Sequence, residues 1–335
     1  MKILITGASG FIGSFLVEEA LRRGMETWAG VRATSSRTWL KESSLHFVEL
    51  DMTKPERLKA QLQAHRDERG AWDYVVHCAG ATKCRREADF DRTNFEATRN
   101  LVDALRELHM EPKQFVFMSS LSVYGPVHED NLELSISRRD TPRPNTAYGR
   151  SKLKAERYLE GLEGFPYVIF RPTGVYGPRE RDYFMMVQSV ARHVDVSVGF
   201  RPQILTFVYV ADVVQAVFLA IDKGVKRRSY FVSDGGVYAS TAFSELIQQE
   251  LGVKHVFRIT LPLWILWLVS ALVGGTAHLL GRSSTLNRDK YKIMKQRNWQ
   301  CDITPLQTEL GYVPQYDLAR GVKETIAWYK KERWI

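Results

Sequence analysis

Tyr148 and Lys152 form the residue pair in this sequence that is best suited to move a proton. They lie four positions apart, so a helix would place both side chains on one face. A phenol ordinarily titrates near pH ~10, and a neighbouring ammonium favours the charged phenolate. We therefore expect Lys152 to lower the pKa of Tyr148 and to make this tyrosine a general acid or base nearer neutral pH.

The surroundings of this pair distinguish it from a chance spacing. The stretch Ser119–Gly125 is rich in hydroxyl groups and precedes Tyr148, and Pro142–Asn145 marks the start of the helix that carries the tyrosine. Tyr291 and Lys295 have the same spacing, but no such stretch comes shortly before them. We interpret this second pair as surface residues of a helix.

Three glycines near the start of the chain predict a phosphate-binding turn. Gly7, Gly10 and Gly13 link the apolar run at residues 3–5 to a helical pattern that begins at Phe11. The first glycine permits a sharp reversal, the second lets a pyrophosphate approach bare backbone, and the third lets the helix pack on the strand. Amide groups at the helix start would then bind phosphate. The pattern indicates a dinucleotide site.

The following residues alternate apolar strands with helical segments. Strands are expected at 26–31, 46–50, 74–77, 115–118 and 167–170, with helices at about 55–69 and 94–108. This alternation predicts a Rossmann α/β fold, a doubly wound parallel sheet with a smaller, mostly helical C-terminal substrate lobe. We expect the Rossmann domain to comprise 1–175 plus about 204–234, and the lobe to comprise about 176–203 plus 235–335.

Ligands of such sheets bind beyond the carboxyl ends of the strands. The residues expected at this edge are Gly7, Arg32, Asp51, Gly80 and Ser120. Two other polar residues are interpreted as parts of the framework of the fold rather than of the ligand site. His77, alone in an apolar strand, is interpreted as a core residue with satisfied hydrogen bonds, and Asp212 as a helix cap.

The loop after the second strand bears on the choice of cofactor. An acidic residue at this place holds a ribose 2′-hydroxyl, whereas an arginine accommodates a 2′-phosphate. Here no Asp or Glu follows the strand, and Arg32 and Arg37 flank the polar residues 33–36. This favours NADP over NAD. The alternative is that both arginines are solvated loop residues.

The composition argues against several classes of protein. The 335 residues carry a formal charge of +9, but Lys and Arg are spread along the chain, which favours attraction of anionic cofactors, substrates or membranes over a nucleic-acid partner. Three scattered cysteines, Cys78, Cys84 and Cys301, predict neither a disulfide framework nor a metal site. The N-terminal residues do not form a signal peptide, so we expect a cytoplasmic location.

Residues 261–281 are the most ambiguous stretch. They include Trp264 and Trp267, many leucines and no Asp, Glu, Lys or Arg, and their length approaches that of a membrane span. Pro262, the glycines at 274 and 275, and His278 interrupt the run. We favour a buried or pocket-lining helix pair, followed by a peripheral contact with a membrane and then by a true span.

Taken together, these motifs resemble those of the extended short-chain dehydrogenase/reductases, of the NAD-dependent epimerase/dehydratase superfamily. The resemblance rests on Gly7–Gly13, Asp51–Met52, His77–Gly80, Ser119–Gly125, Tyr148–Lys152 and Arg171–Pro178. It implies that Ser120 binds the substrate oxygen, that Tyr148 is the general acid/base, and that Lys152 holds the nicotinamide ribose while lowering the Tyr148 pKa. With the arginine discussed above, the implied cofactor contacts are Gly7, Gly10, Phe11, Ile12, Gly13, Arg32, Asp51, Met52, Ala79, Gly80, Asn94, Tyr148, Lys152, Pro172 and Val175.

Departures from the family pattern narrow the choice of activity. Sugar-nucleotide dehydratases carry Asp-Glu where Leu121–Ser122 stands here, so dehydration is not expected. Sugar-nucleotide epimerases usually carry Arg-Asp-Phe at the place of Leu205–Phe207, which weakens the case for nucleotide-sugar binding. The residues around 287–290, 299–302 and 325–329 are instead similar to the 3β-hydroxysteroid dehydrogenase and dihydroflavonol reductase branch.

We therefore expect an NAD(P)-dependent oxidoreductase that transfers hydride between nicotinamide and a secondary alcohol or ketone on a lipophilic small molecule. The alternative is an NDP-sugar epimerase of the same superfamily, which uses the same residues and regenerates its cofactor in each cycle. A third hypothesis is a dinucleotide-binding sensor or scaffold without turnover, and the intact set of Ser120, Tyr148 and Lys152 argues against it. A homodimer is expected from the resemblance alone.

Overall fold

The computed structural model describes residues 1–268, 270 and 288–335, and these residues form two compact units. The first unit contains Met1–Val123, Ala147–Arg171 and Val214–Tyr230, and the second contains Tyr124–Thr146, Pro172–Val213 and Phe231–Ile335. The chain therefore passes between the units several times, and each unit is assembled from distant segments.

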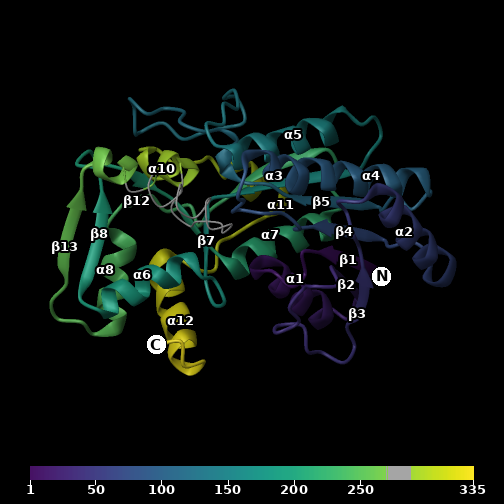
Figure 1. Cartoon of the computed structure of the whole chain (residues 1–335), viewed down its shortest axis with the longest axis horizontal. Coiled ribbons are helices and arrows are strands. Elements are labelled where there is room, and N and C mark those ends of the chain that lie inside the picture. Colours follow the sequence, from purple (N-terminus) through teal and green to yellow (C-terminus); the bar gives the residue numbers. More distant parts are fainter. Residues whose placement is uncertain (269, 271–287) are drawn as a thin grey trace. The chain divides into compact units, whose positions relative to one another are not determined.

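A seven-stranded sheet forms the centre of the first unit (Figure 1). Its strands are β1 (Lys2–Thr6), β2 (Glu26–Val31), β3 (His46–Glu49), β4 (Tyr74–His77), β5 (Gln114–Met118), β6 (Tyr167–Pro172) and β11 (Arg228–Val232). They lie in the order β11-β6-β5-β4-β1-β2-β3, and the neighbours from β6 to β3 pair in parallel. The predicted Rossmann-type α/β fold is confirmed.

Helices cover both faces of this sheet. They are α1 (Phe11–Arg22), α2 (Pro55–Arg69), α3 (Glu87–Phe90), the π-helical turn η1 (Asp91–Glu96), α4 (Ala97–Glu107), the 3-10 turn η2 (Leu121–Val123), α5 (Ala147–Gly161) and α7 (Val210–Lys223). One apolar core joins the sheet to α2, α4 and α5, with Leu62, Leu101 and Leu159 fully buried between the layers. On the other face, α1 and α7 lie together, since Arg23 pairs with Asp222 at 2.8 Å.

Local sequence explains where these helices begin and end. Pro55 occupies the first turn of α2, where its missing amide leaves no hydrogen bond unmade. Gly70 follows the last residue of α2 with a φ of +79°, a conformation that suits glycine. Two predicted boundaries were wrong. The helical run expected from about 94 already begins with α3 at Glu87, so that residue 94 lies within η1, and α5 begins only at Ala147.

The second unit combines short paired strands with helices. Its elements are β7 (Gly174–Tyr176), α6 (Asp182–Ala191), β8 (Val194–Val198), β9 (Ile204–Leu205), β10 (Phe207–Tyr209), β12 (Tyr238–Ala239), α8 (Ala242–Leu251), β13 (Phe257–Leu261), α10 (Arg288–Lys295), α11 (Thr304–Leu310) and α12 (Leu318–Lys331). Strand β10 pairs with β7, β12 with β9 and β13 with β8. Its core is aromatic: the ring of Phe243 lies 5.2 Å from that of Tyr176 and 4.8 Å from that of Tyr183.

Two further sequence predictions fall in the second unit. Tyr291 and Lys295 both lie on α10, which has no buried residue, as expected of a surface pair. Asp212 does not cap its own helix, because α7 begins at Val210; its buried carboxylate instead accepts the amides of Gln315 and Tyr316 at 2.9 and 3.0 Å.

The ambiguous stretch 261–281 is described only in part. Residues 263–268 are helical, with Leu266 buried and Trp264 and Trp267 exposed, while 269 and 271–281 lie outside the described residues. Within the described part of the chain, none of the helices has the length and apolar character needed to cross a membrane.

Candidate active site

Glycines shape the turn between β1 and α1. Gly7 has a φ of +67°, and a Cβ atom at this position would lie 2.7 Å from the amide nitrogen of Ala79. A Cβ on Gly13 would lie 2.1 Å from the carbonyl oxygen of Gly7, so the first turn of α1 packs directly on the loop. The Gly10 amide closes the turn by donating to the Gly7 carbonyl at 2.9 Å. This bare-backbone turn at a helix N-terminus fits the pyrophosphate of a dinucleotide.

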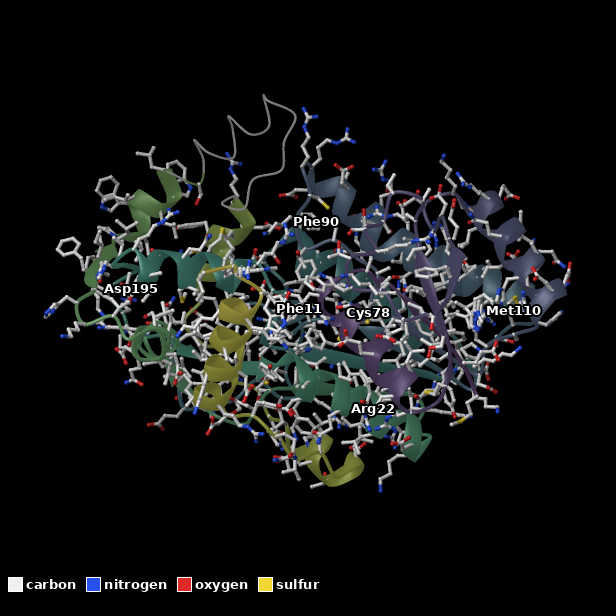
Figure 2. The ribbon with its side chains drawn as sticks, turned by 90° about the horizontal axis from the view of Figure 1, so that it is seen from below. Phe11, Arg22, Cys78, Phe90, Met110 and Asp195 are labelled. Atoms are coloured by element: carbon white, nitrogen blue, oxygen red, sulfur yellow. The ribbon has the colours of Figure 1, made fainter. Side chains whose placement is uncertain are left out.

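The two residues between Gly10 and Gly13 begin a helix, as the sequence predicted. Phe11 and Ile12 are the first residues of α1, and both are partly exposed. Cys78, which follows β4 beside the glycine turn, can be located with Phe11 in Figure 2. Burial raises the pKa of the Cys78 thiol to about 12, so this cysteine stays protonated at neutral pH.

Gly80 marks the place where Asn94 and Lys152 meet. A Cβ on Gly80 would lie 2.9 Å from Oδ1 of Asn94 and 3.2 Å from Nζ of Lys152. The buried Asn94 amide holds the loop after β4, because its Oδ1 accepts the Ala81 amide at 2.7 Å and its Nδ2 donates to the Ala81 carbonyl at 3.0 Å. The same Nδ2 donates to the Ser151 hydroxyl of α5 at 3.0 Å. Residues from β4, η1 and α5 thus converge at one point.

Tyr148, Lys152 and Ser120 also come together, as the sequence predicted. Tyr148 and Lys152 lie on α5, and the Tyr148 hydroxyl is hydrogen-bonded to Ser120, which follows β5. The buried Lys152 ammonium donates to the carbonyl of Met118 at 2.8 Å and lies 4.7 Å from the centre of the Phe117 ring. The end of β5 therefore positions both the hydroxyl partner and the ammonium.

The pKa values of this pair differ from the expectation. Loss of hydration raises the pKa of Tyr148 to about 12, although the hydrogen bond with Ser120 acts in the opposite direction. Burial also lowers the pKa of Lys152 to about 8. The expected lowering of the Tyr148 pKa by Lys152 is not found for the protein alone, because loss of hydration outweighs the hydrogen bond with Ser120.

His77 is a core residue, as its position in an apolar strand indicated. It is fully buried, its Nδ1 lies 2.7 Å from the Thr6 hydroxyl, and its Nε2 lies 2.9 Å from the Thr98 hydroxyl. Thr98 already donates to the Asn94 carbonyl at 2.6 Å, so Nε2 carries the proton and Nδ1 accepts from Thr6. Burial lowers the His77 pKa to about 3, and the ring is neutral.

The residues predicted near the adenosine lie after β2 and β3 at the same edge of the sheet. The Arg32 side chain is exposed, while the Arg37 guanidinium lies 4.2 Å from the centre of the Phe47 ring. Asp51 and Met52 are held through their backbones: the Asp51 amide donates to the Gln61 side chain at 2.9 Å, and the Met52 carbonyl accepts from Asn100 at 2.9 Å. The Asp51 carboxylate also accepts the Thr53 hydroxyl at 2.7 Å, so it helps to hold its own loop.

Pro172 and Val175 belong to the second unit. Pro172 is the last residue of β6, and Val175 lies in β7 opposite Val208. This unit also contains a cavity of about 180 Å³, whose lining is polar and includes Thr206, Ser233, Cys301 and Asp302. Thr206 is buried and donates its hydroxyl to the Trp299 carbonyl at 2.6 Å.

Sequence reasoning missed several residues that position this site. The π-helical turn η1 sets the direction of Asn94, and no local pattern signalled it. Ser151 links Asn94 to α5, and it could have been recognised because it lies between Tyr148 and Lys152 on the same helix. Ser119 is buried, and its hydroxyl has no hydrogen-bond partner among the described residues.

Comparison with known proteins supports this assignment of the fold. The chain is 27% identical to a UDP-glucose 4-epimerase of Vibrio cholerae over 97% of its length and 94% of that protein. It is 21% identical to a decarboxylating sterol-4-alpha-carboxylate 3-dehydrogenase of Saccharomyces cerevisiae, over 98% and 97%. The crystal structure of a UDP-glucose 4-epimerase of Thermotoga maritima has the same fold, with a TM-score of 0.79, 23% identity and coverage of 99% and 100%.

The family model covers the glycine turn, Ser120, Tyr148 and Lys152 in a single match. It is the model of the NAD dependent epimerase/dehydratase family, and it matches residues 3–233. The resemblance to the 3β-hydroxysteroid dehydrogenase branch stays a prediction. The chain belongs to the NAD dependent epimerase/dehydratase family.

Proposed function

We propose that this enzyme oxidises a secondary alcohol of its substrate to a ketone and that Tyr148 receives the hydroxyl proton. The hydrogen bond between Tyr148 and Ser120, with Lys152 one helical turn along α5, carries this proposal. Ser120 would hold the substrate oxygen beside the phenol. A group with a raised pKa is a strong proton acceptor once it is ionised, and it returns the proton readily when the ketone is reduced again.

The glycine turn fits a nicotinamide dinucleotide, which supplies the hydride acceptor. Gly7, Gly10 and Gly13 would hold the pyrophosphate, and Lys152 would hold the nicotinamide ribose. Oxidation breaks one C–H and one O–H bond: the hydride leaves with two electrons, and the proton goes to the oxygen of Tyr148 in its phenolate form. Asn94 keeps the loop after β4 in place beside the Lys152 ammonium.

We infer that the substrate is a nucleotide-linked sugar, which the enzyme releases as its epimer. The epimerases of Vibrio cholerae and Thermotoga maritima, which the chain matches over nearly its whole length, support this substrate class. Dehydration is disfavoured by the site itself. Leu121 is buried with 1% of its surface exposed, and Ser122 is bound to Ser120 at 3.1 Å, so no second acid or base follows Ser120.

A second candidate is the net oxidation or reduction of a lipophilic alcohol. Thr206 favours it, because it stands within the segment where nucleotide-sugar epimerases usually carry Arg-Asp-Phe. The Thr206 hydroxyl donates a hydrogen bond to the Trp299 carbonyl. Its neighbour Leu205 carries no charge, so it cannot form an ion pair with a pyrophosphate. The match to a yeast sterol dehydrogenase agrees with this alternative.

The stoichiometry of the cofactor distinguishes the two candidates. With UDP-glucose or UDP-galactose, an epimerase interconverts the two sugars without net formation of NADH or NADPH, whereas a dehydrogenase changes the absorbance of the nicotinamide in proportion to product. Tyr148→Phe is expected to abolish turnover and to leave cofactor affinity nearly unchanged. Full activity of Tyr148→Phe would remove the tyrosine from the mechanism.

We further propose that the loop after β2 accepts a 2′-phosphate. The exposed side chain of Arg32 and the absence of an acidic residue from 32–37 support a preference for NADP within this NAD-dependent family. Isothermal titration should show tighter binding of NADP than of NAD, and Arg32→Ala should lose this preference. Tighter binding of NAD by the unaltered protein would refute the role of Arg32.

A further inference from the structure

The two-stranded sheet of β8 and β13 has one polar and one apolar face. The parallel register pairs Asp195 with Arg258 and Ser197 with Thr260. Successive side chains of a strand point to opposite faces, so the other face carries only apolar residues. They are Val194, Val196, Val198, Phe257, Ile259 and Leu261.

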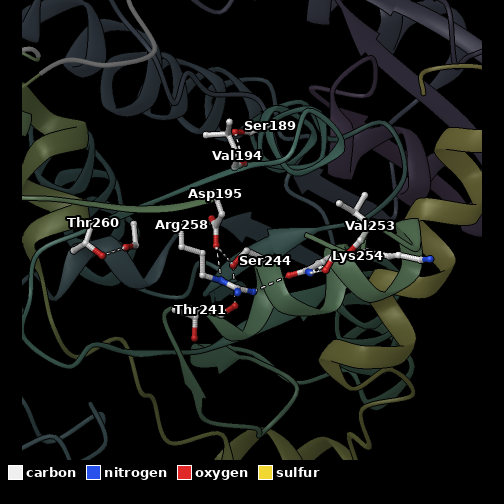
Figure 3. Close-up of polar contacts among 11 residues, drawn as sticks. Ser189, Val194, Asp195, Thr241, Ser244, Val253, Lys254, Arg258 and Thr260 are labelled. Atoms are coloured by element: carbon white, nitrogen blue, oxygen red, sulfur yellow. Dashed lines mark hydrogen bonds and ion pairs between the residues drawn. The ribbon is translucent and has the colours of Figure 1, made fainter. Parts of the chain in front are cut away.

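The polar face is turned toward α8. The buried Asp195 carboxylate accepts the Ser244 hydroxyl at 2.8 Å and lies 3.7 Å from the Arg258 guanidinium, as Figure 3 shows. Arg258 also donates to the Gln248 side chain of α8 at 2.8 Å. These contacts fix the orientation of the sheet, and they turn its apolar face away from α8.

The apolar face and the adjoining segments are unusually accessible. Phe257 is 70% exposed and Val196 is 44% exposed, and the other four residues of the face are partly exposed. The parallel strands end side by side, where the Gly199 amide donates to the Leu261 carbonyl at 2.9 Å. Beyond this end, Phe200 is 74% and Trp264 is 67% exposed. We call Val196, Phe200, Phe257, Trp264, Trp267 and Leu268 the aromatic patch.

Within the segments 191–204 and 252–268, which carry this patch, the exposed charged side chains are all Arg or Lys. Exposed Arg192, Arg201 and Lys254 belong to the segments that form it. Residues 252–268 contain no Asp or Glu, and in 191–204 the one carboxylate, Asp195, is buried on the opposite face. An anionic partner with an apolar interior therefore complements this surface in both charge and polarity.

We propose that the aromatic patch docks on the surface of a lipid bilayer that carries anionic headgroups. Tryptophan and phenylalanine side chains insert at the boundary between headgroups and acyl chains, and basic residues beside them bind anionic lipid. A second copy of the chain is a poorer occupant. A two-fold symmetric contact through this face would bring the same cations against one another.

Vesicle binding tests the proposal on the full chain. The protein is sedimented with vesicles of phosphatidylcholine alone or mixed with phosphatidylglycerol, and we expect binding to the mixed vesicles. Trp264→Ser combined with Trp267→Ser should abolish it. Arg201→Glu combined with Lys254→Glu should weaken it by about 25-fold or more, since each basic residue near an anionic surface contributes about fivefold.

Matched controls come from the same unit. Val313 is 61% exposed and Lys323 is exposed, and neither belongs to the patch. Val313→Ser and Lys323→Glu should bind vesicles as the unaltered protein does, and equal melting temperatures would show that all variants fold. A single Phe257→Ser variant repeats the test if the double tryptophan variant does not fold.

Three results would overturn the proposal. The first is no binding of the unaltered protein to the mixed vesicles. The second is equal binding by the patch variants and the controls. The third is self-association in sedimentation equilibrium that the tryptophan variants abolish without any vesicle binding, which would assign the patch to a second copy of the chain.

Discussion

The buried ammonium of Lys152 should make the stability of the first unit depend on alkaline pH. A fall of the Lys152 pKa from its ordinary 10.5 to about 8 corresponds to about 3 kcal/mol between the folded and unfolded states. At pH values between the folded-state pKa of about 8 and the unfolded-state pKa of 10.5, Lys152 is protonated in the unfolded chain and neutral in the folded chain. The free energy of unfolding therefore rises with pH in this range. Below about pH 8 the full cost of the buried charge is present.

Lys152→Met isolates this effect, because methionine has a similar length and no charge. The free energy of unfolding is measured by urea titration of the cofactor-free proteins at several values between pH 7 and 10.5. We expect the unaltered protein to gain about 3 kcal/mol relative to Lys152→Met over this range. Loss of the hydrogen bond to the Met118 carbonyl changes the difference in unfolding free energy between the two proteins by the same amount at every pH. The slope of this difference with pH is therefore the informative quantity.

Lys154 provides the control on the same helix. It is exposed and pairs with Asp91 at 2.6 Å, and a surface pair of this kind contributes about 0–1 kcal/mol. The difference between the unaltered protein and Lys154→Met should therefore change little with pH. A flat difference for Lys152→Met as well would refute the assignment of a depressed pKa to the buried ammonium.

The remaining predictions concern the framework of the site. Gly13→Ala should lower the free energy of unfolding by about 1–3 kcal/mol and abolish cofactor binding in titration calorimetry. Gly161→Ala is the control, because a Cβ at this position would meet open space, and it should change neither quantity. Glu156→Gln should cost up to about 3–5 kcal/mol in urea unfolding, because it removes the carboxylate that lies 2.8 Å from the buried Arg171 guanidinium and leaves the more distant Glu160 carboxylate at 3.8 Å. Asn94→Ala should raise the KM for the cofactor more than it lowers kcat, and equal effects would contradict a positioning role.

The strands and the glycine turn were predictable because their causes are local. Strands β2 and β4 occur where the sequence predicted them, since short apolar runs bounded by polar residues identify buried strands. Gly7 and Gly13 owe their role to backbone geometry, which glycine spacing records directly. The common face of Tyr148 and Lys152 followed from their spacing within one helix, whereas the place of Ser120 beside them was implied by the family resemblance.

Features that depend on distant contacts were not predictable. The pair β8–β13 joins segments separated by the whole of α7 and α8, and each strand alone is short. Asp212 looked like a helix cap because its partners, the amides of Gln315 and Tyr316, lie far along the chain. The raised pKa of Tyr148 depends on how much water the fold removes, which residue spacing does not reveal.

This difference also explains why the redox chemistry was easier to predict than the substrate. Ser120, Tyr148, Lys152 and the glycine turn all lie in the first unit, where strand ends and one helix fix their positions. Leu205 and Thr206 lie in the second unit, whose short strands are held by contacts such as that between Thr206 and the Trp299 carbonyl. In the proposed mechanism, a sequence change there would alter substrate contacts without disturbing Tyr148. The same hydride chemistry can therefore serve a nucleotide sugar or a lipophilic alcohol, and Leu205→Arg is the substitution that should shift affinity toward UDP.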